Sequence, residues 1–193
     1  MSAERLSVLI LAGGEATRLP NKLALEAGPL PLIARVYRNV SHARPTYVSC
    51  ASTFPAEIDA LLPCPMVVDR WPHRGPLSGL VSTMKEIRTP YVFAVAGDAP
   101  FVESRFIDRL LAALEPGDEA VVPAHASGIE PLAAIYDREA FLREGLPMLL
   151  DGAGTLHRVI EKLRARFVPI DDPRIFTNVN TPADYAAVRE VFS

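Results

Sequence analysis

The chain has 193 residues, of which 49% are hydrophobic, and a formal net charge of -3 at pH 7. This length suits one α/β domain that buries roughly two thirds of its unfolded surface, so we expect a single domain over residues 1–193. The low charge, without a polybasic run, argues against binding of nucleic acid or anionic membranes through global charge. No apolar stretch approaches about 18 residues, and the start of the chain lacks the apolar core of a signal peptide, so we expect a cytoplasmic protein.

The first element is an apolar run at residues 7–11, typical of a strand that is buried on both faces. It leads into Gly13 and Gly14, which lack a Cβ and let the backbone turn its N–H groups toward an anion at close range. Arg18 and Lys22 follow, and these are the two kinds of cation that proteins direct at phosphate oxygens. The stretch predicts a phosphate-binding loop, with an ordinary glycine turn as the alternative.

Strand and helix patterns alternate along the rest of the chain. In chain order we expect helix 31–41, strand 46–51, helix 55–62, strand 66–69, helix 77–87, strand 91–96, helix 105–114, strands 120–123 and 132–136, helices 138–144 and 155–165, strand 167–170 and helix 183–191. Such alternation predicts an α/β fold with a doubly wound, mostly parallel sheet. Ligands bind such sheets at the carboxyl ends of the strands, so residues that follow a strand are the first candidates for a site.

Asp98 follows the most β-rich run of the chain, residues 91–96, and should face the same crevice as the glycine loop. Mg²⁺ prefers carboxylate oxygen together with phosphate oxygens and retained water, so one aspartate can hold a metal ion that a triphosphate largely coordinates itself. The alternative is that Asp98 only caps the turn before Pro100.

Two further stretches place polar groups after strands. Asp69 ends the strand expected at 66–69, and the glycine- and proline-rich helix start that follows can offer free N–H groups to an anion. Its alternative is a plain surface turn. Near the end of the chain, Asn178 and Asn180 alternate along an extended segment, which puts both side chains on one face. We interpret them as substrate-facing, although Thr181 and Pro182 next to them also make a sound helix start.

Histidines and cysteines contribute little to the expected site. His73, His125 and His157 lie far apart without metal-ligand spacing, so each is expected at the surface or at a helix cap. The two cysteines, Cys50 and Cys64, lack metal or redox spacing and are expected to be buried thiols.

Together these motifs resemble the nucleotidyltransferases, and most closely the molybdenum cofactor guanylyltransferases of the MobA family. Residues 11–22 resemble L-A-G-G-x-x-x-R-[ML]-x-x-K, residues 75–79 resemble G-P-L-x-G, residues 97–100 resemble the metal-binding segment G-D-x-P, and residues 176–184 resemble F-x-N-[VI]-N-T-P-x-[DE]. The family usually has a glycine after the Arg-Met pair and a longer spacer before the lysine. Leu19, Pro20 and Asn21 stand there in this chain and make the loop shorter and stiffer.

The resemblance implies a Rossmann-like nucleotidyltransferase fold and a reaction in which the terminal phosphate of molybdopterin attacks the α-phosphate of GTP and releases pyrophosphate. It implies Mg²⁺ as the cofactor, with Asp98 as its ligand, and GTP and molybdopterin as partners, with transient contacts to other cofactor-biosynthesis proteins or molybdoenzymes. The catalytic residues it implies are Arg18, Lys22 and Asp98; the GTP-binding residues are Leu11, Ala12, Gly13, Gly14, Lys22, Ser49, Asp69 and Asp98; the acceptor-binding residues are Gly79, Pro131, Asn178 and Asn180.

Glu130 is an acidic departure at a position where the family commonly shows a polar residue before Pro-Leu. An acid that faces an anionic pterin phosphate is unfavourable. We therefore expect that Glu130 points away from the site or that the acceptor differs.

Two alternatives to this function remain open. Cytidylyl transfer to molybdopterin, or nucleotidyl transfer to a sugar-1-phosphate or to cobinamide phosphate, would use the same loop. The pair Gly13 and Gly14 favours guanylyl transfer, because cytidylyl enzymes that resemble this chain usually carry L-A-A-G. A non-catalytic accessory protein that binds nucleotide and cofactor is the second alternative, and the shortened loop is its only support in the sequence.

Overall fold

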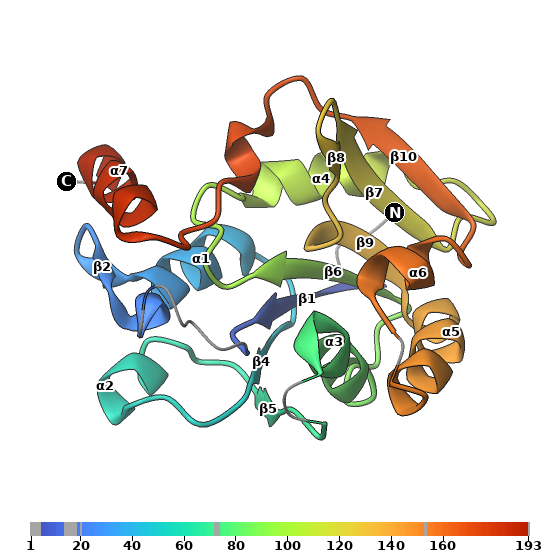
Figure 1. Cartoon of the computed structure of the whole chain (residues 1–193), viewed down its shortest axis with the longest axis horizontal. Coiled ribbons are helices and arrows are strands. Elements are labelled where there is room, and N and C mark those ends of the chain that lie inside the picture. Colours follow the sequence, from blue (N-terminus) through green and yellow to red (C-terminus); the bar gives the residue numbers. More distant parts are fainter. Residues whose placement is uncertain (1–4, 14–18, 20, 72–73, 153, 193) are drawn as a thin grey trace.

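The computed structural model describes residues 5–13, 19, 21–71, 74–152 and 154–192, and in them a mostly parallel sheet lies between two helical layers (Figure 1). Its strands are β1 (Leu6–Leu11), β4 (Thr46–Cys50), β5 (Met66–Val68), β6 (Tyr91–Ala96), β7 (Ala120–His125), β8 (Gly128–Ile129), β9 (Ala133–Asp137) and β10 (Ala165–Pro169). The strand order is β10-β7-β9-β6-β1-β4-β5, and β8 pairs with β7. β9 runs antiparallel to both β6 and β7, whereas β6, β1, β4 and β5 are parallel to one another.

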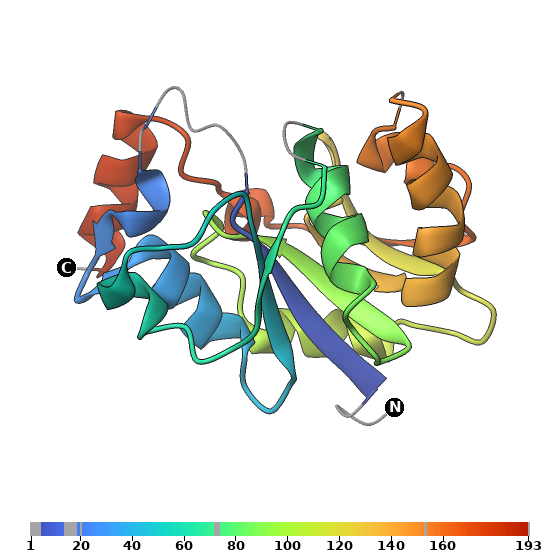
Figure 2. The same cartoon turned by 90° about the horizontal axis from the view of Figure 1, so that it is seen from below.

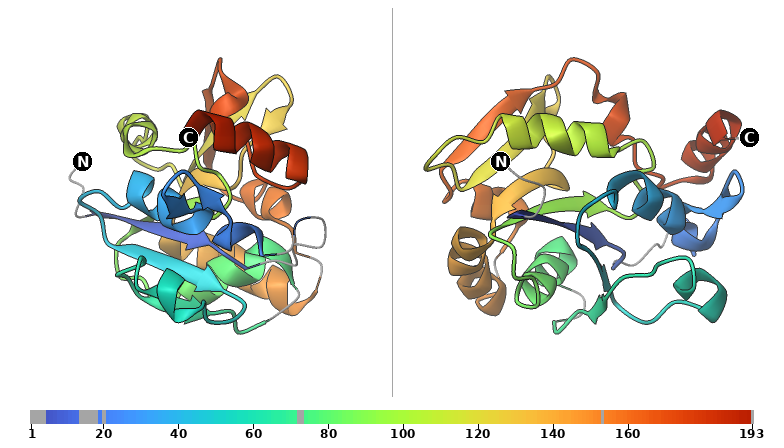
Figure 3. Two further views of the ribbon diagram at one scale, coloured as in Figure 1. Left: turned by 90° about the vertical axis from the view of Figure 1, so that its left-hand side faces the viewer. Right: turned by 180° about the vertical axis from the view of Figure 1, so that it is seen from behind.

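The helices cover both faces of the sheet (Figure 3). On one face lie α1 (Leu32–Val40), α2 (Ala56–Asp59) and α4 (Ser104–Ala112), and on the other lie α3 (Gly75–Met84), α5 (Arg138–Leu150) and α6 (Leu156–Ile160). Side chains alternate between the two faces along β1. Val8 and Ile10 pack in the layer of α1, α2 and α4, and Leu9 and Leu11 pack in the layer of α3, α5 and α6. This two-sided burial explains why the strand is apolar throughout.

A smaller unit flanks the sheet. The hairpin of β2 (Glu26–Ala27) and β3 (Leu30–Pro31) packs against the last helix, α7 (Pro182–Phe192), through buried Ala27, Leu32, Val179 and Val188. This contact brings the end of the chain next to the segment that follows the glycine loop. No helix among the described residues is long and apolar enough to cross a bilayer.

The strand order reverses beside β1, because β4 pairs with one of its edges and β6 with the other. The loops that leave β1 and β6 therefore emerge side by side: the N–H of Gly97 donates to the carbonyl of Leu11 at 2.8 Å. A Cβ on Gly97 would lie 3.0 Å from that carbonyl oxygen and 2.8 Å from Cδ1 of Ile33, so the missing side chain favours this close approach. Figure 2 shows the end of β1 and the start of α3 at the same edge of the sheet. Open α/β sheets bind ligands at this kind of reversal.

The fold class expected from the sequence is confirmed, but several helix boundaries were wrong, those of α5 and α6 by the most residues. The helix expected at 138–144 continues through Gly145 and Pro147 to Leu150. Gly145 is a packing position, since a Cβ there would lie 3.3 Å from Cδ1 of Leu77, and its absence lets α5 approach α3. The helix expected at 155–165 ends at Ile160, because the chain turns to enter β10 and the carboxylate of Glu119 accepts the N–H of Arg164 at 3.0 Å.

Candidate functional site

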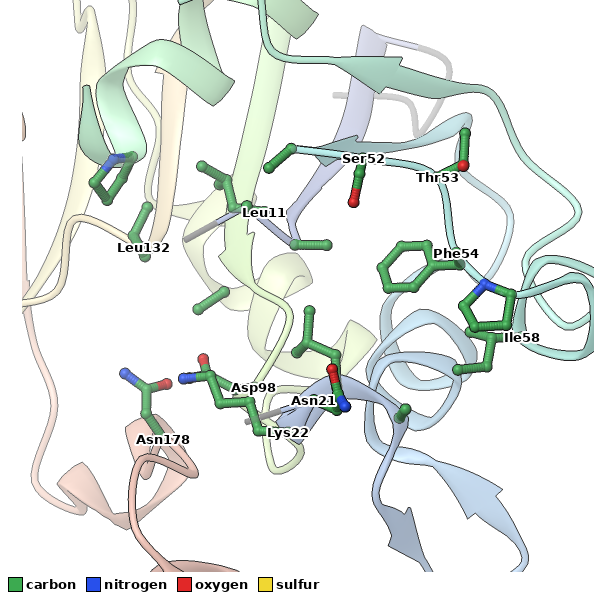
Figure 4. Close-up of a pocket in the computed structure, with 18 residues that line it drawn as sticks. Leu11, Asn21, Lys22, Ser52, Thr53, Phe54, Ile58, Asp98, Leu132 and Asn178 are labelled. Atoms are coloured by element: carbon green, nitrogen blue, oxygen red, sulfur yellow. The ribbon is translucent and has the colours of Figure 1, made fainter. Parts of the chain in front are cut away.

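Two cavities lie next to each other, and the first of them opens where β1, β4 and β6 end. The first has a volume of about 770 Å³ and is drawn in Figure 4; its lining comprises Leu11, Ala12, Gly13, Asn21, Lys22, Leu23, Ala24, Ala51, Ser52, Thr53, Phe54, Pro55, Ile58, Pro76, Ala96, Asp98, Leu132 and Asn178. The second has a volume of about 420 Å³ and is lined by Arg74, Gly75, Pro76, Leu77, Glu130, Pro131, Leu132, Gly154, Thr155, Leu156, His157 and Asn178. Pro76, Leu132 and Asn178 belong to both linings, so the cavities share a wall.

Lys22 and Asp98 meet in the first cavity (Figure 4). The ammonium of Lys22 forms an ion pair with the carboxylate of Asp98, and it also donates a hydrogen bond to Oδ1 of Asn180 at 2.9 Å. The side chains of Lys22 and Asp98 are 18% and 11% exposed, so both remain open to the cavity while little bulk water screens them. Lys22 begins the short 3-10 helix Lys22–Ala24, and Asn21 before it has a φ of 54°. The three expected site residues thus form one connected group.

The segment that carries the two asparagines is fixed to the loop after β6. The N–H of Val179 donates to the carbonyl of Asp98 at 3.0 Å. Beyond it, Oδ2 of Asp184 accepts the N–H of Thr181 at 2.8 Å, and the N–H of Asp184 donates to Oγ1 of Thr181 at 3.2 Å. This reciprocal cap starts α7 as the sequence predicted. Asn178 lies on the shared wall of the two cavities, and Asn180 accepts a hydrogen bond from Lys22.

Asp69 lies behind the glycine loop, between β1 and α3. A Cβ on Gly13 would lie 3.0 Å from Oδ2 of Asp69, and a Cβ on Gly79 would lie 3.4 Å from its Oδ1 and 2.5 Å from Oγ of Ser49. The Ser49 hydroxyl donates to Oδ1 of Asp69 at 2.5 Å. Burial raises the pKa of Asp69, and this hydrogen bond lowers it by a smaller amount. Two glycines and a serine therefore surround one carboxylate.

Ser49, Asp69 and Gly79 line neither cavity, and the Ser49 side chain is fully buried. We interpret Ser49 and Gly79 as residues that position Asp69, while the direct ligand contacts expected of them stay predictions. Gly14, Arg18 and Pro20 lie outside the described residues, so the phosphate contact expected of Arg18 also stays a prediction.

The donor set of the first cavity fits a magnesium ion that arrives with a triphosphate. Among the described residues, no cluster of at least three His, Cys, Asp or Glu side chains could hold a metal ion by itself. Mg²⁺ does not need such a cluster, because it is usually held by one or two carboxylates together with substrate phosphates and water. Asp98 lines the first cavity and offers one carboxylate, so the residues present fit such a site.

Glu130, for which the sequence left open either a position away from the site or a different acceptor, lines the second cavity. His125 was expected at the surface or at a helix cap, but its side chain is only 10% exposed. It stacks on Phe176 with ring centroids 5.9 Å apart, and its Nε2 lies 2.8 Å from Oε1 of Glu130. The sequence concealed this pair because its two members are separated by a hairpin turn of β7 and β8.

Sequence reasoning also missed the loop after β4. Ser52, Thr53 and Phe54 line the first cavity and offer two hydroxyls and an aromatic ring. The rule that pointed to Asp69 and Asp98, namely that residues after a strand face the ligand, applies to these residues as well. Arg74 in the second cavity had no comparable signal, because it precedes a helix.

Known proteins are similar to this chain in sequence. A model of the family described as the MobA-like NTP transferase domain matches residues 8–170. A probable molybdenum cofactor guanylyltransferase from Natronomonas pharaonis is 30% identical and covers 98% of this chain and 99% of its own. A molybdenum cofactor guanylyltransferase from Desulfosudis oleivorans is also 30% identical, over 90% of this chain and 89% of its own.

Solved structures agree in fold. The crystal structure of molybdopterin-guanine dinucleotide biosynthesis protein A from Archaeoglobus fulgidus superimposes with a TM-score of 0.81 at 24% identity, over 96% of this chain and 97% of that one. A 4-diphosphocytidyl-2C-methyl-D-erythritol synthase from Anaerococcus prevotii reaches a TM-score of 0.78 at 13% identity, over 98% and 96% of the two chains.

Proposed function

The chain belongs to the family of MobA-like NTP transferase domains, and we propose that it transfers GMP from GTP to molybdopterin. The products are pyrophosphate and a guanine dinucleotide form of the cofactor. The names of the relatives that cover nearly the whole chain support this assignment over cytidylyl transfer or transfer to another phosphate acceptor. We place the reaction in the cytoplasm and allow for transient contacts with other proteins of cofactor synthesis or with molybdoenzymes.

The observation that carries the proposal is the shared wall of the two cavities. A direct transfer between two substrates requires that the attacking oxygen lie next to the phosphorus it attacks. In our assignment GTP occupies the first cavity and molybdopterin the second, and their phosphates meet at Pro76, Leu132 and Asn178. One acceptor phosphate oxygen then forms a bond to the α-phosphorus, while the bond from the α-phosphorus to the bridging oxygen of pyrophosphate breaks.

The residues of the first cavity supply the charges that this step needs. Phosphoryl-type transfer depends mainly on position and on neutralisation of negative charge. Lys22 would neutralise the triphosphate and the departing pyrophosphate, and Asp98 would hold Mg²⁺. When bound, Mg²⁺ would add positive charge at the α-phosphate. No side chain has to act as a nucleophile, because the acceptor phosphate is the nucleophile.

The second cavity has a feature suited to an acceptor phosphate. The first turn of α3 lines it through Gly75, Pro76 and Leu77, and the side chain of the N-cap residue, Arg74, makes no capping hydrogen bond to this ten-residue helix. Uncapped N–H groups at a helix start, together with the helix dipole, favour an anion. Because Pro76 also lines the first cavity, this turn lies where the acceptor phosphate would approach GTP.

Pyrophosphate release tests the function. We expect release that requires GTP, Mg²⁺ and molybdopterin together, with CTP, sugar-1-phosphates and cobinamide phosphate as poor replacements. Release with CTP in preference to GTP would assign cytidylyl transfer. Binding of GTP and molybdopterin without any release of pyrophosphate would assign an accessory protein instead.

A further inference from the structure

The carboxylate of Glu130 is held at a defined place in the lining of the second cavity. Nε2 of His125 lies 2.8 Å from Oε1 of Glu130, and the N–H of Ser127 donates to Nδ1 of the same imidazole at 3.2 Å. Because Nδ1 accepts a hydrogen bond, it carries no proton, so the proton of the neutral ring is on Nε2 and is donated to Glu130. Among the described residues, nothing donates to the second oxygen, Oε2, of this cavity-lining side chain.

The backbone around Glu130 is equally well fixed. The N–H of Glu130 donates to the carbonyl of Pro123 at 3.0 Å, and its own carbonyl accepts the N–H of Ala133 at 3.2 Å. The hydroxyl of fully buried Tyr136 donates to the carbonyl of the next residue, Pro131, at 2.7 Å. A carboxylate on such a rigid frame is preorganised to read one hydrogen-bond donor of a ligand.

We propose that Glu130 recognises the 2-amino group of the acceptor's pterin ring. The assignment rests on the proposed function, since it places molybdopterin in the second cavity. Oε2 accepts an N–H of that amino group, and the apolar walls formed by Leu77, Pro131 and Leu156 pack against the pterin ring system. In this assignment the acceptor presents its pterin ring to Glu130 and its phosphate to the shared wall. The acid therefore meets a hydrogen-bond donor and not the anionic end of the acceptor.

Guanine carries the same amino group, so the charge pattern alone also fits the base of GTP. The location favours the pterin. Glu130 lines the second cavity, whereas the glycine loop, Lys22 and Asp98, which bind the triphosphate in our assignment, line the first.

The test compares two ligands that differ at one position. They are a pterin with a phosphooxymethyl group at position 6 and the lumazine with the same group, in which a carbonyl replaces the 2-amino group. Binding is followed by ligand fluorescence. We expect the wild-type protein to prefer the pterin by about 10-fold to 100-fold, the scale of one hydrogen bond to a charged group. The lumazine carbonyl would instead face Oε2, acceptor against acceptor.

Glu130→Gln should invert this preference. The amide oxygen in this variant still accepts from His125, so its NH₂ group faces the cavity and donates to the lumazine carbonyl. Glu130→Ala should bind both ligands with similar affinity. This variant keeps the test valid if the amide of Glu130→Gln rotates and places its oxygen toward the cavity. Glu139→Gln is the matched control, because it removes the same charge from a side chain that is 80% exposed and outside both cavities.

The outcomes separate this assignment from the proposed function. Equal wild-type affinities for the two ligands, no saturable binding of either, or a preference that is unchanged in both Glu130→Gln and Glu130→Ala would overturn the role of Glu130, even if the protein releases pyrophosphate with molybdopterin. An inverted preference without pyrophosphate release would keep the role and contradict the function. If Glu130→Gln instead weakens GTP relative to ITP, which lacks the 2-amino group, then Glu130 reads guanine and the pterin assignment is wrong.

Discussion

The ammonium of Lys22 is paired with the carboxylate of Asp98, 76 positions further along the chain, and not directed at open solvent. The resemblance implies that Lys22 binds phosphate and that Asp98 binds the metal ion. In the free protein each one neutralises the other, so a nucleotide must compete with an existing ion pair. Asn180 holds Lys22 from a third segment, at 2.9 Å. The group thus links the first cavity to the segment that carries the asparagines.

Lys22→Ala should depress the single-turnover rate more than it weakens binding of GTP. Binding of the ground state has to break the pair with Asp98, which offsets much of the new phosphate contact, whereas charge on the departing pyrophosphate develops only in the transition state. We expect a rate loss of about 100-fold or more and a change in Kd below about 10-fold.

Single-turnover kinetics and calorimetry at fixed salt measure the two effects in the Lys22→Ala protein, because screening alters ion pairs. Lys162→Ala, at an exposed position away from both cavities, is the control. Equal losses of rate and affinity would show that Lys22 is a simple ground-state phosphate ligand.

Asp98→Asn should keep the fold and lower the rate by about 100-fold or more, the effect of losing one preorganised electrostatic contact. The amide also cannot hold Mg²⁺ as a carboxylate does. Titration of Mn²⁺ into the protein with GTP present should show weakened metal binding in this variant and no change in Asp151→Asn, whose side chain lies outside both cavities. Full activity of Asp98→Asn would mean that Asp98 only caps a turn.

Gly79→Ala should destabilise the protein by about 1–3 kcal/mol, the usual cost of added volume in a packed interior. The new Cβ would lie 2.5 Å from Oγ of Ser49 and would push the Asp69 carboxylate from its place. Removal of that hydroxyl in the double variant Gly79→Ala/Ser49→Ala should recover part of the loss, and urea unfolding of the single and double variants measures the coupling. Strictly additive effects would contradict a contact between these two positions.

Asp69 should make stability depend on pH in the direction opposite to most acids. Burial raises its pKa above the ordinary value of 3.8, so the folded protein holds the proton more tightly than the unfolded chain does. Its favourable contribution is present below pH 3.8 and is lost as the pH rises through the folded pKa. Asp69→Asn should therefore gain stability relative to wild type as the pH rises through this window.

Glu119 provides a matched comparison, because its pKa is shifted in the direction opposite to that of Asp69. The N–H of Arg164 and the guanidinium of Arg143 lower its pKa below 4.5, so its contribution is present above that pH and is lost in acid. Glu119→Gln should lose stability relative to wild type as the pH rises. Urea unfolding at several pH values measures both variants. The same sign for both, or no dependence on pH, would contradict the burial of Asp69.

Much of the fold could be predicted because burial on both faces leaves a clear pattern. The apolar run at 91–96 became β6 at its expected bounds, and the periodic residues of α1 lie in the core. The hairpin of β2 and β3 could not be found, because its strands have two residues each and carry no period. Nor does the sequence record the reversed direction of β9, which depends on the strands beside it.

The site was predictable where it depends on strand ends and not where it depends on distant pairings. Gly13 and Asp98 follow strands, and the order of an open sheet brought them to one edge. The partners of Lys22 and Glu130 come from side-chain contacts that no local pattern records. In the sequence, Glu130 stood out only as an acid that would be unfavourable beside a pterin phosphate. The structure shows that His125 holds one of its oxygens, and our interpretation of Glu130 follows from that contact.

The most direct test of the account follows the phosphorus atoms of GTP. The protein is incubated with Mg²⁺, molybdopterin and GTP labelled in either the α- or the γ-phosphate. We predict that the α-label appears in a guanine dinucleotide of the pterin, that the γ-label appears in an equal amount of pyrophosphate, and that neither forms when molybdopterin is left out. Pyrophosphate release that does not depend on the acceptor, or α-label that never joins the pterin, would contradict direct transfer between the two cavities.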